Sequence, residues 1–186
     1  HARVEGIMTE MTQTILATAR NPILHGAKDF TCCLLDTHGA SILSMVDCIP
    51  VHVGTMSPPL RFIIRAFGDD IREGDVFLNN AAYAGNSHVG DFTMFAPLFY
   101  EGKLVAWAAS KCHLLDIGAH LPTSMDPFAK DIYEEGFHFP GVRLCRDHRP
   151  ITDLVRFIAY NFRYSQQWHG DFLAQLSSLW VAEARI

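Results

Sequence analysis

The first apolar pattern of the chain predicts a helix. Between Val4 and Arg20, apolar side chains recur every three to four residues, which is the period of one helix face. They are Val4, Ile7, Met8, Met11, Ile15 and Ala19. The dipeptide Asn21-Pro22 ends this helix, because the residue before a proline is disfavoured in the helical conformation.

Two pairs of apolar runs predict β-hairpins. The runs Asp29 to Asp36 and Ala40 to Val46 are separated by a short polar turn. Farther along, Phe92 to Tyr100 and Lys103 to Ala109 are rich in aromatic and aliphatic residues. Only Glu101-Gly102 separates them, which is a two-residue hairpin signal. Each pair is therefore expected to form two antiparallel strands.

The remaining pattern mixes helices, short strands and loops. Ser57 followed by two prolines supplies an N-cap residue and a proline in the first helical turn. We expect helices at Ser57 to Phe67, Ala129 to Gly136, Ile151 to Phe162 and after Gly170, strands at Val76 to Leu78 and Phe139 to Leu144, and a long loop from Leu114 to Phe128. These elements predict an α+β fold, with a mixed sheet of β-hairpins flanked by helices.

Length and charge limit the classes of protein. With 186 residues the chain is long enough for one domain. Lys and Arg number 15 against 20 Asp and Glu, and the basic residues are scattered, which argues against nucleic-acid binding. No apolar run approaches the roughly 20 residues that span a bilayer, so we expect a cytoplasmic protein without membrane contact. Because the chain begins at His1 and stops inside an apolar helical pattern, we interpret residues 1–186 as one region of a longer subunit.

Cysteine usage and short motifs narrow the chemistry further. The five cysteines are an odd number, Cys32 and Cys33 are adjacent, and none forms a Cys-x-x-Cys pair. This pattern predicts reduced, mostly buried thiols rather than disulfides or a thiolate zinc site. The sequence also has no Gly-x-x-x-x-Gly-Lys-Ser/Thr, Gly-x-Gly-x-x-Gly or Gly-x-Ser-x-Gly motif. Neither a nucleotide site nor a serine nucleophile is therefore predicted.

Three candidate metal ligands flank the second predicted hairpin. His88 and Asp91 precede its first strand, and His113 follows its second. A strand pair that goes out and returns brings its two ends together, so the three side chains can converge. Imidazole and carboxylate together suit Zn, Mn or Fe. A single histidine near a strand end is more often a turn or core residue, so the prediction depends on the set.

Two other polar residues keep alternative roles. Asp29 opens the first predicted strand, where its carboxylate either caps a turn or faces a site. His52 lies in the irregular stretch before the Ser57 helix and is either a site residue or a buried histidine satisfied by the backbone. The residue pattern alone leaves both alternatives open.

Eight stretches of sequence stand in an order and spacing that make a specific set. They are Glu10 to Pro22, Asp29 to Cys32, Pro50 to Met56, Gly74 to Asn79, Gly85 to Asp91, His113 to Gly118, Tyr133 to Gly136 and Gly170 to Gln175. With them the chain resembles the hydantoinase B family, which includes B-type subunits of ATP-dependent hydantoinases and 5-oxoprolinases and α-type subunits of acetone and acetophenone carboxylases. The resemblance is to the N-terminal part of these longer subunits.

The resemblance implies a metal subunit that works beside a separate ATP-using, hydantoinase A-type subunit in a hetero-oligomer. It implies His88, Asp91 and His113 as ligands of one divalent transition metal, Zn, Mn or Fe, with Asp29 as a fourth ligand. ATP with Mg would be used by the partner subunit to phosphorylate a small-molecule substrate. One departure from the family pattern is Asn86, which replaces the second Gly of a Gly-Gly pair, so the loop that lines the site is expected to differ.

Three functions follow from this reading of the sequence. The first is metal-dependent hydrolysis of a cyclic amide of the hydantoin or 5-oxoproline type, with Asp116 or His52 as a nearby acid or base. The second keeps the site and changes the reaction to ATP-dependent carboxylation of a ketone. The third is a non-catalytic structural or interaction subunit, whose exposed helical stripes would form the interface.

Overall fold

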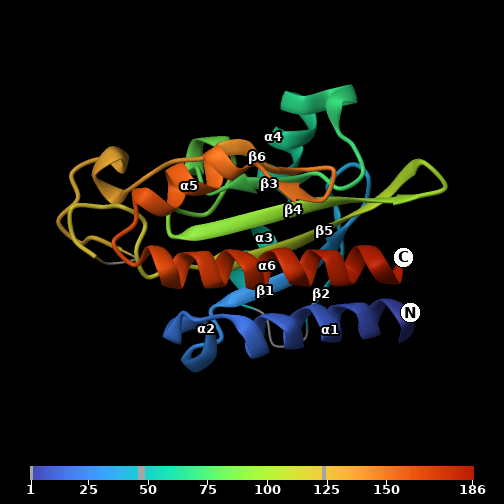
Figure 1. Ribbon diagram of the computed structural model, residues 1–186, viewed down its shortest axis with the longest axis horizontal. Coiled ribbons are helices and arrows are strands. Elements are labelled where there is room, and N and C mark those ends of the chain that lie inside the picture. The colour runs from blue at the N-terminus through green and yellow to red at the C-terminus, as the bar shows by residue number, and fades with distance from the viewer. Residues whose placement is uncertain (1, 46–48, 123–124) are drawn as a thin grey trace.

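A computed structural model describes residues 2–45, 49–122 and 125–186, and it shows an open β-sheet with helices on both faces (Figure 1). On one face, α1 (Ala2–Thr18) and α6 (Ser165–Arg185) lie side by side, and both chain ends lie at the same end of the molecule. Beside α6 packs α5 (Thr152–Tyr160). The opposite face carries α3 (Pro50–Gly54) and α4 (Ser57–Phe67).

In the described parts of the chain, the sheet has seven strands in the order β2-β1-β5-β4-β3-β6-β7. They are β1 (Phe30–Leu35), β2 (Ser41–Ser44), β3 (Val76–Asn79), β4 (Asp91–Tyr100), β5 (Lys103–His113), β6 (Pro140–Arg146) and β7 (Arg149–Pro150). The predicted α+β class is confirmed. All six pairings between the described strands are antiparallel, however, so the sheet lacks the mixed character that we expected. Three pairs are hairpins, and such short connections produce antiparallel neighbours.

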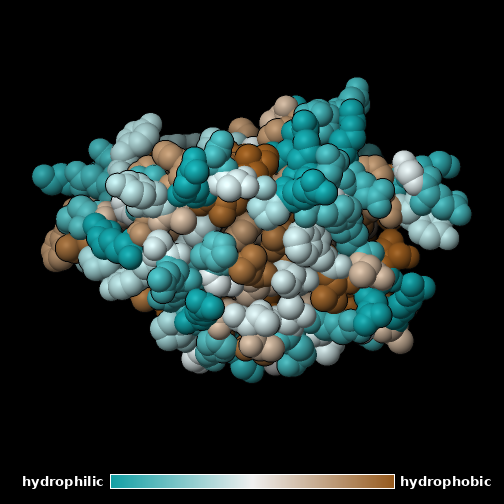
Figure 2. All heavy atoms as spheres, in the orientation of Figure 1, coloured by the Kyte–Doolittle hydropathy of each residue, from teal (hydrophilic) through white to brown (hydrophobic). Residues whose placement is uncertain are grey.

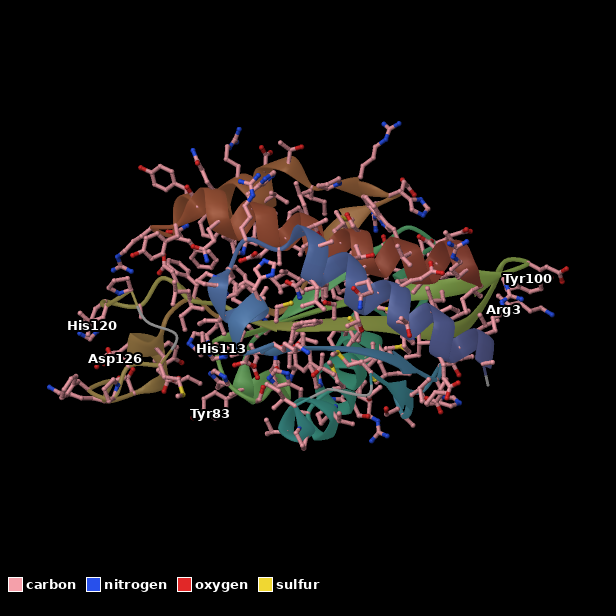
Figure 3. The ribbon with its side chains drawn as sticks, turned by 90° about the horizontal axis from the view of Figure 1, so that it is seen from below. Arg3, Tyr83, Tyr100, His113, His120 and Asp126 are labelled. Carbon is pink, nitrogen blue, oxygen red and sulfur yellow. The ribbon has the colours of Figure 1, made fainter. Side chains whose placement is uncertain are left out.

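The central hairpin of β4 and β5 is the predicted one. Its turn residues, Glu101 and Gly102, have φ of 49° and 73°, as a two-residue turn that matches the twist of its strands requires. β5 continues to His113 instead of ending at Ala109, so it is longer than expected. Figure 3 shows Tyr100, beside the turn, at one end of the molecule and His113 toward the other, with His120 and Asp126 farther out.

Alternate side chains of the central strands fill two cores, one on each face of the sheet. Phe77, Phe95 and Trp107 belong to the core that α4 covers with Leu60 and Ile63. The core on the other face contains Phe92, Met94 and Leu98 of β4, together with the apolar stripes of α1 and α6. Those stripes include Ile7, Met11, Ile15, Phe172, Leu176 and Leu179, all of which are buried.

The apolar stripes of α1 and α6 therefore face the core and are not the exposed stripes expected of an interaction subunit. Figure 2 shows hydrophobic side chains scattered among hydrophilic ones on this face. Among the described helices, none combines the length and the hydropathy that crossing a bilayer requires.

Several local elements differ from the sequence prediction. The last helix begins at Ser165, so Gly170 lies inside it, where an added Cβ would lie 2.4 Å from Cδ of Arg20. A glycine at this position thus lets α6 approach the end of α1. The stretch before α4 contains the unpredicted α3, and Asn21 caps the short α2 (Pro22–Gly26). The expected end of the second strand at Val46 lies outside the described residues.

Three short 3-10 turns also occur among the residues that the structure describes. They are Gly68–Asp70, Ala82–Ala84 and Ile132–Glu135. The last of them takes the place of the short α-helix expected from Ala129 to Gly136. Asp131 caps this turn by accepting a hydrogen bond from the backbone N–H of Tyr133, and Gly136 ends it with φ of 131°. Only the four residues between them are helical.

Candidate metal centre

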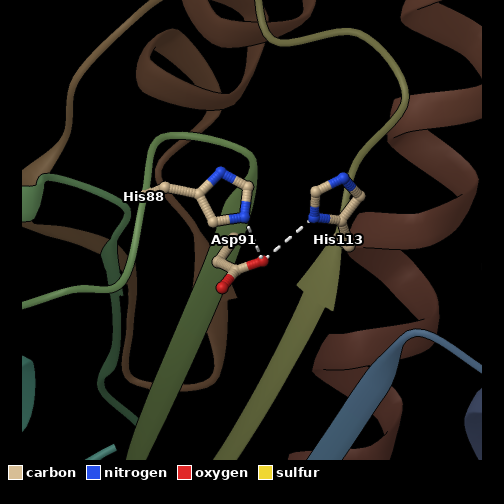
Figure 4. Close-up of side chains that lie close together, drawn as sticks. All are labelled: His88, Asp91 and His113. Carbon is tan, nitrogen blue, oxygen red and sulfur yellow. Dashed lines mark hydrogen bonds and ion pairs between the residues drawn. The ribbon is translucent and has the colours of Figure 1, made fainter. Parts of the chain in front are cut away.

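Three side chains converge at the open end of the central hairpin (Figure 4). The Oδ1 of Asp91 lies 3.1 Å from the Nε2 of His88 and 3.1 Å from the Nδ1 of His113. One potential ligand atom from each residue lies within 4.8 Å of the other two. The structure thus brings together three of the four residues that the sequence predicts as ligands.

The backbone around β4 and β5 holds this arrangement. The N–H of Asp91 donates to the carbonyl of His88 over 3.2 Å, which closes the turn that carries both residues. The N–H of Leu114 donates to the carbonyl of Gly90 over 2.9 Å and joins that turn to the end of β5. The Asp91 side chain is only 2% exposed, whereas that of His88 is 33% exposed. The carboxylate is therefore the buried anchor, and His88 is the ligand candidate that faces solvent.

The electrostatics of Asp91 favour its ionised form. Burial alone raises the pKa of the Asp91 carboxyl, but hydrogen bonds from His113, His52 and His88 outweigh burial and hold that pKa well below its usual range. Asp91 is therefore a carboxylate at neutral pH. A negative, buried oxygen between two imidazoles is the environment that attracts a divalent cation.

His52 lies behind the three converging residues and connects Asp91 to Asp29. Its Nε2 lies 3.5 Å from Oδ1 of Asp29 and 3.6 Å from Oδ2 of Asp91, and its Nδ1 lies 3.2 Å from the hydroxyl of Thr31. The carbonyl of Asp29 also accepts a hydrogen bond from the N–H of His113 over 3.0 Å. Asp29 is thus adjacent to the site, but its carboxylate contacts His52, and its role as a fourth ligand stays a prediction.

The donor set fits a catalytic transition metal. Two imidazole nitrogens and one carboxylate oxygen are the protein ligands of many sites that keep a coordination position open for water or substrate. The partial exposure of His88 places that open side toward solvent. The residues present therefore fit Zn, Mn or Fe, the metals expected from the sequence.

The sequence prediction did not include Lys111, which is fully buried beside the site. Its Nζ lies 2.8 Å from Oγ1 of Thr55, 2.8 Å from Oδ1 of Asn86, 3.0 Å from Oγ of Ser87 and 3.9 Å from Oδ2 of Asp91. Burial lowers the pKa of Lys111 to about 8, although the charge of Asp91 opposes that shift. The predicted strand ended at Ala109, two residues before Lys111. Lys111 therefore fell outside the apolar run, in which a charged residue would have been conspicuous.

Asp116, expected as an acid or base, makes its contacts elsewhere. Its two oxygens accept hydrogen bonds from the backbone N–H groups of Gly118, Arg163 and Tyr164 and from the guanidinium of Arg163. The contacts with Arg163 and Tyr164 join the loop after β5 to the segment that leads into α6, and the contact with Gly118 closes a turn within that loop. These contacts favour a structural role for Asp116.

Comparisons with known proteins agree with this fold. A family model described as Hydantoinase B/oxoprolinase matches residues 1–186. Caprolactamase subunit beta of Pseudomonas jessenii is 37% identical over 184 residues, which are 98% of this chain and 31% of that subunit. The 5-oxoprolinase of Dictyostelium discoideum is 31% identical over 176 residues, covering 95% of this chain and 14% of that protein.

A carboxylase subunit and a solved structure extend the comparison. The acetophenone carboxylase delta subunit of Aromatoleum aromaticum is 33% identical over 165 residues, covering 83% of this chain and 24% of that subunit. This relative is named a delta subunit, whereas the resemblance led us to expect an α-type subunit. The crystal structure of ATP-dependent caprolactamase from Pseudomonas jessenii matches with a TM-score of 0.91 and 36% identity, over 99% of this chain and 32% of that chain. The chain thus spans about a third or less of each of these relatives.

Proposed function

This chain belongs to the hydantoinase B/oxoprolinase family, and we propose that it contributes the metal centre of a two-component, ATP-dependent enzyme that hydrolyses a cyclic amide. The substrate class comes from relatives named caprolactamase and 5-oxoprolinase. Caprolactam, 5-oxoproline and hydantoin all contain a ring amide. The substrate proposed here is therefore a small molecule with that group.

The convergence of His88, Asp91 and His113 is the observation that supports this proposal. A bound Zn, Mn or Fe ion would polarise the substrate carbonyl or lower the pKa of a water molecule. The protein's own task is to hold the three ligand atoms in place. Asp91 supplies the negative charge, and the two imidazoles approach it from the turn before β4 and from the end of β5.

His52 is the residue that we propose to hold a proton beside the ligand set. Its Nε2 lies between the carboxylates of Asp29 and Asp91, and its side chain is only 4% exposed. The Thr31 hydroxyl on its other nitrogen fixes the orientation of the ring. Asp116 is less suited to this task, because both of its oxygens already accept hydrogen bonds.

ATP is assigned to a partner in this proposal. These 186 residues contain no Gly-x-x-x-x-Gly-Lys-Ser/Thr loop, while a relative of known structure is named ATP-dependent caprolactamase. Two of the relatives are also named as subunits. We therefore place ATP and Mg on a hydantoinase A-type subunit that activates the amide and forms a hetero-oligomer with this chain.

Ketone carboxylation is the second candidate function. It is favoured by the 33% identity to the acetophenone carboxylase delta subunit over 83% of this chain. The same ligand set would then hold an activated ketone beside carbon dioxide. The two reactions differ in one measurable requirement, because only carboxylation consumes bicarbonate or carbon dioxide.

Reconstitution with the ATP-using subunit tests both candidates. The purified chain is mixed with hydantoin, 5-oxoproline, caprolactam, acetone or acetophenone, with and without bicarbonate, ATP-Mg and the partner subunit. We expect turnover only when ATP and the partner are both present, and its dependence on bicarbonate separates hydrolysis from carboxylation. Turnover by the isolated chain without ATP would contradict the two-component proposal. An Asp91→Asn complex that keeps full turnover would instead favour a non-catalytic subunit.

A further inference from the structure

Lys111 is a buried cation that the proposed chemistry does not use. It lies on β5 two residues before His113, opposite Thr93 of β4 and Thr31 of β1, and its side chain is 0% exposed. A buried ammonium is costly unless each of its three N–H groups finds an acceptor. Lys111 meets that condition, because three side-chain oxygens lie within 3.0 Å of its Nζ.

Those oxygens belong to two segments that carry site residues. Thr55 follows α3, which bears His52, and its hydroxyl donates in turn to the carbonyl of Val51 over 2.8 Å. Asn86 and Ser87 form the start of the turn that bears His88. One ammonium group therefore ties both segments to β5.

The hydrogen bonds of Ser87 have a defined direction. Lys111 donates to the Ser87 oxygen, so the single hydroxyl proton of Ser87 must go to another acceptor. The Ser87 hydroxyl also lies 3.2 Å from Oδ1 of Asn86, but that oxygen already accepts from Lys111 and from the N–H of Ser87, each over the shorter distance of 2.8 Å. The remaining acceptor is Oδ2 of Asp91, which lies in close hydrogen-bond contact with the Ser87 hydroxyl. Two hydrogen bonds in series thus run from Lys111 through Ser87 to Asp91.

These two hydrogen bonds give the two oxygens of Asp91 different partners. Oδ2 is bound by Ser87 and faces His52, whereas Oδ1 faces His88 and His113. We propose that Lys111 is a positioning residue that, through Ser87, reserves Oδ2 for the protein and leaves Oδ1 as the only oxygen of Asp91 that binds the metal. The inference rests on the proposed metal centre, since it assigns the way in which one of the proposed ligands binds.

Two physical effects of Lys111 on metal binding have opposite signs. As a positive charge near a divalent cation, the ammonium repels the metal, so its removal alone would raise the affinity. As a positioning group, it holds a ligand in one orientation, and loss of such an outer partner typically lowers metal affinity by about 10- to 100-fold. The direction of the change therefore distinguishes the two roles.

The test is a Co²⁺ titration of the full chain after chelation, followed by visible absorption. Lys111→Met keeps much of the side-chain volume and removes the charge and the donors. Ser87→Ala keeps the charge of Lys111 and removes the hydroxyl that links Lys111 to Asp91. Ser87→Thr keeps a hydroxyl at this position and is the matched control. We expect Lys111→Met and Ser87→Ala each to weaken Co²⁺ binding about 10-fold or more and to change the absorption bands, with Ser87→Thr close to wild type.

The double variant measures whether Lys111 acts through Ser87. We expect the double variant, Lys111→Met with Ser87→Ala, to bind Co²⁺ about as weakly as the weaker single variant, because both substitutions interrupt the same series of hydrogen bonds to Asp91. Unchanged or tighter binding by Lys111→Met, or fully additive losses, would overturn the inference. If Lys111→Met does not fold, the Ser87→Ala variant is sufficient for the test. Unchanged Co²⁺ affinity and unchanged absorption bands in that variant would overturn the inference. A His88→Ala protein that still binds Co²⁺ normally would instead reject the proposed metal centre.

Discussion

Asp91 and His113 are directly opposite each other in the ladder between β4 and β5, at the open end of the central hairpin. Their side chains meet over 3.1 Å, from Oδ1 of Asp91 to Nδ1 of His113. Because side chains alternate between the two faces of a strand, a slip of one residue in this register would turn His113 toward the other face. The pairing of two apolar strands therefore determines the geometry of a polar site.

Loss of either histidine should remove the metal. We expect the folded protein to hold about one equivalent of Zn, Mn or Fe, and His88→Ala and His113→Ala to lose most of it, because two protein ligands bind a transition metal much more weakly than three. Elemental analysis of the purified variants gives the measurement. His148→Ala is the control, since His148 contacts Glu183. Unchanged metal content in His88→Ala would end the assignment of the site.

The turn that carries His88 depends on Gly85. Its φ is +96°, and an added Cβ would lie 2.7 to 2.9 Å from the backbone and side chain of Pro58 and the nitrogen of Pro59. Gly85→Ala should therefore be destabilised both by the left-handed backbone and by the clash, by about 2 to 5 kcal/mol in total, and should bind less metal. Thermal unfolding and metal content are measured together.

Gly102→Ala is the matched control for that substitution. Gly102 also has a positive φ, +73°, but nothing lies within 4 Å of a Cβ added there. Gly102→Ala should lower the free energy of unfolding only by the backbone strain, about 1 to 2 kcal/mol, and leave the metal content unchanged. Equal effects of the two substitutions would mean that Pro58 moves aside and that the clash does not shape the turn.

Much of the hairpin and its ligands was predictable from the sequence. The apolar runs and the Glu101-Gly102 turn determine the pairing of neighbouring strands, and the pairing brings Asp91 to His113. These are local relationships, which sequence spacing captures. The position of β3 between β4 and β6 arises from pairing across long connections, which periodicity does not encode.

The surroundings of the ligands were less predictable for the same reason. Lys111 meets Thr55 and Asn86 across 56 and 25 residues of sequence, and Asp116 meets Arg163 across 47. His52 reaches the site on α3, a short helix without a clear apolar stripe. Such contacts depend on the packing of whole elements against the sheet, and a motif of two or three residues does not contain that information.

Asp116 should matter for stability more than for metal binding. Asp116→Ala leaves three backbone N–H groups and the Arg163 guanidinium without their acceptor, which should cost about 1 to 3 kcal/mol. The metal content should stay the same. Arg163→Ala should cost less, because that side chain is 44% exposed and the backbone contacts to Asp116 remain. If Asp116→Ala instead keeps its unfolding temperature and abolishes turnover of the complex, Asp116 is an acid or base.

The buried thiols should react slowly in the native protein. Cys32, Cys33, Cys112 and Cys145 are all buried, and burial raises the pKa of Cys32 and of Cys145 to about 12 and that of Cys112 well above its usual value. Very little of Cys32, Cys112 or Cys145 is therefore in the thiolate form at neutral pH. In a Cys48→Ser background, which removes the one cysteine outside the described residues, labelling with a thiol reagent should require unfolding, with or without metal. Rapid labelling of Cys112 that follows metal removal would make this thiol a ligand.

Asp171 should give the stability of the protein a distinctive dependence on pH. This buried carboxyl accepts hydrogen bonds from the N–H groups of Arg20 and Asn21 through one oxygen, at 2.6 and 3.0 Å. Burial raises its pKa above the ordinary value of 3.8, more than these hydrogen bonds lower it. As pH rises, the Asp171 carboxyl therefore loses its proton in the unfolded chain before it does so in the folded protein. The contribution of Asp171 to the stability of the fold is greatest below pH 3.8 and is lost as pH rises through the pKa of the folded state.

Asp171→Asn should remove that loss, because an amide oxygen can accept the same two hydrogen bonds without carrying a charge. The unfolding temperature of Asp171→Asn relative to wild type should rise from pH 4 to pH 7. Asp171→Ala is the control: it leaves two N–H groups without their acceptor and should be destabilised by about 1 to 3 kcal/mol across this range. An Asp171→Asn protein that is as unstable as Asp171→Ala at pH 7 would show that the native structure requires the ionised carboxylate, contrary to the direction of its pKa.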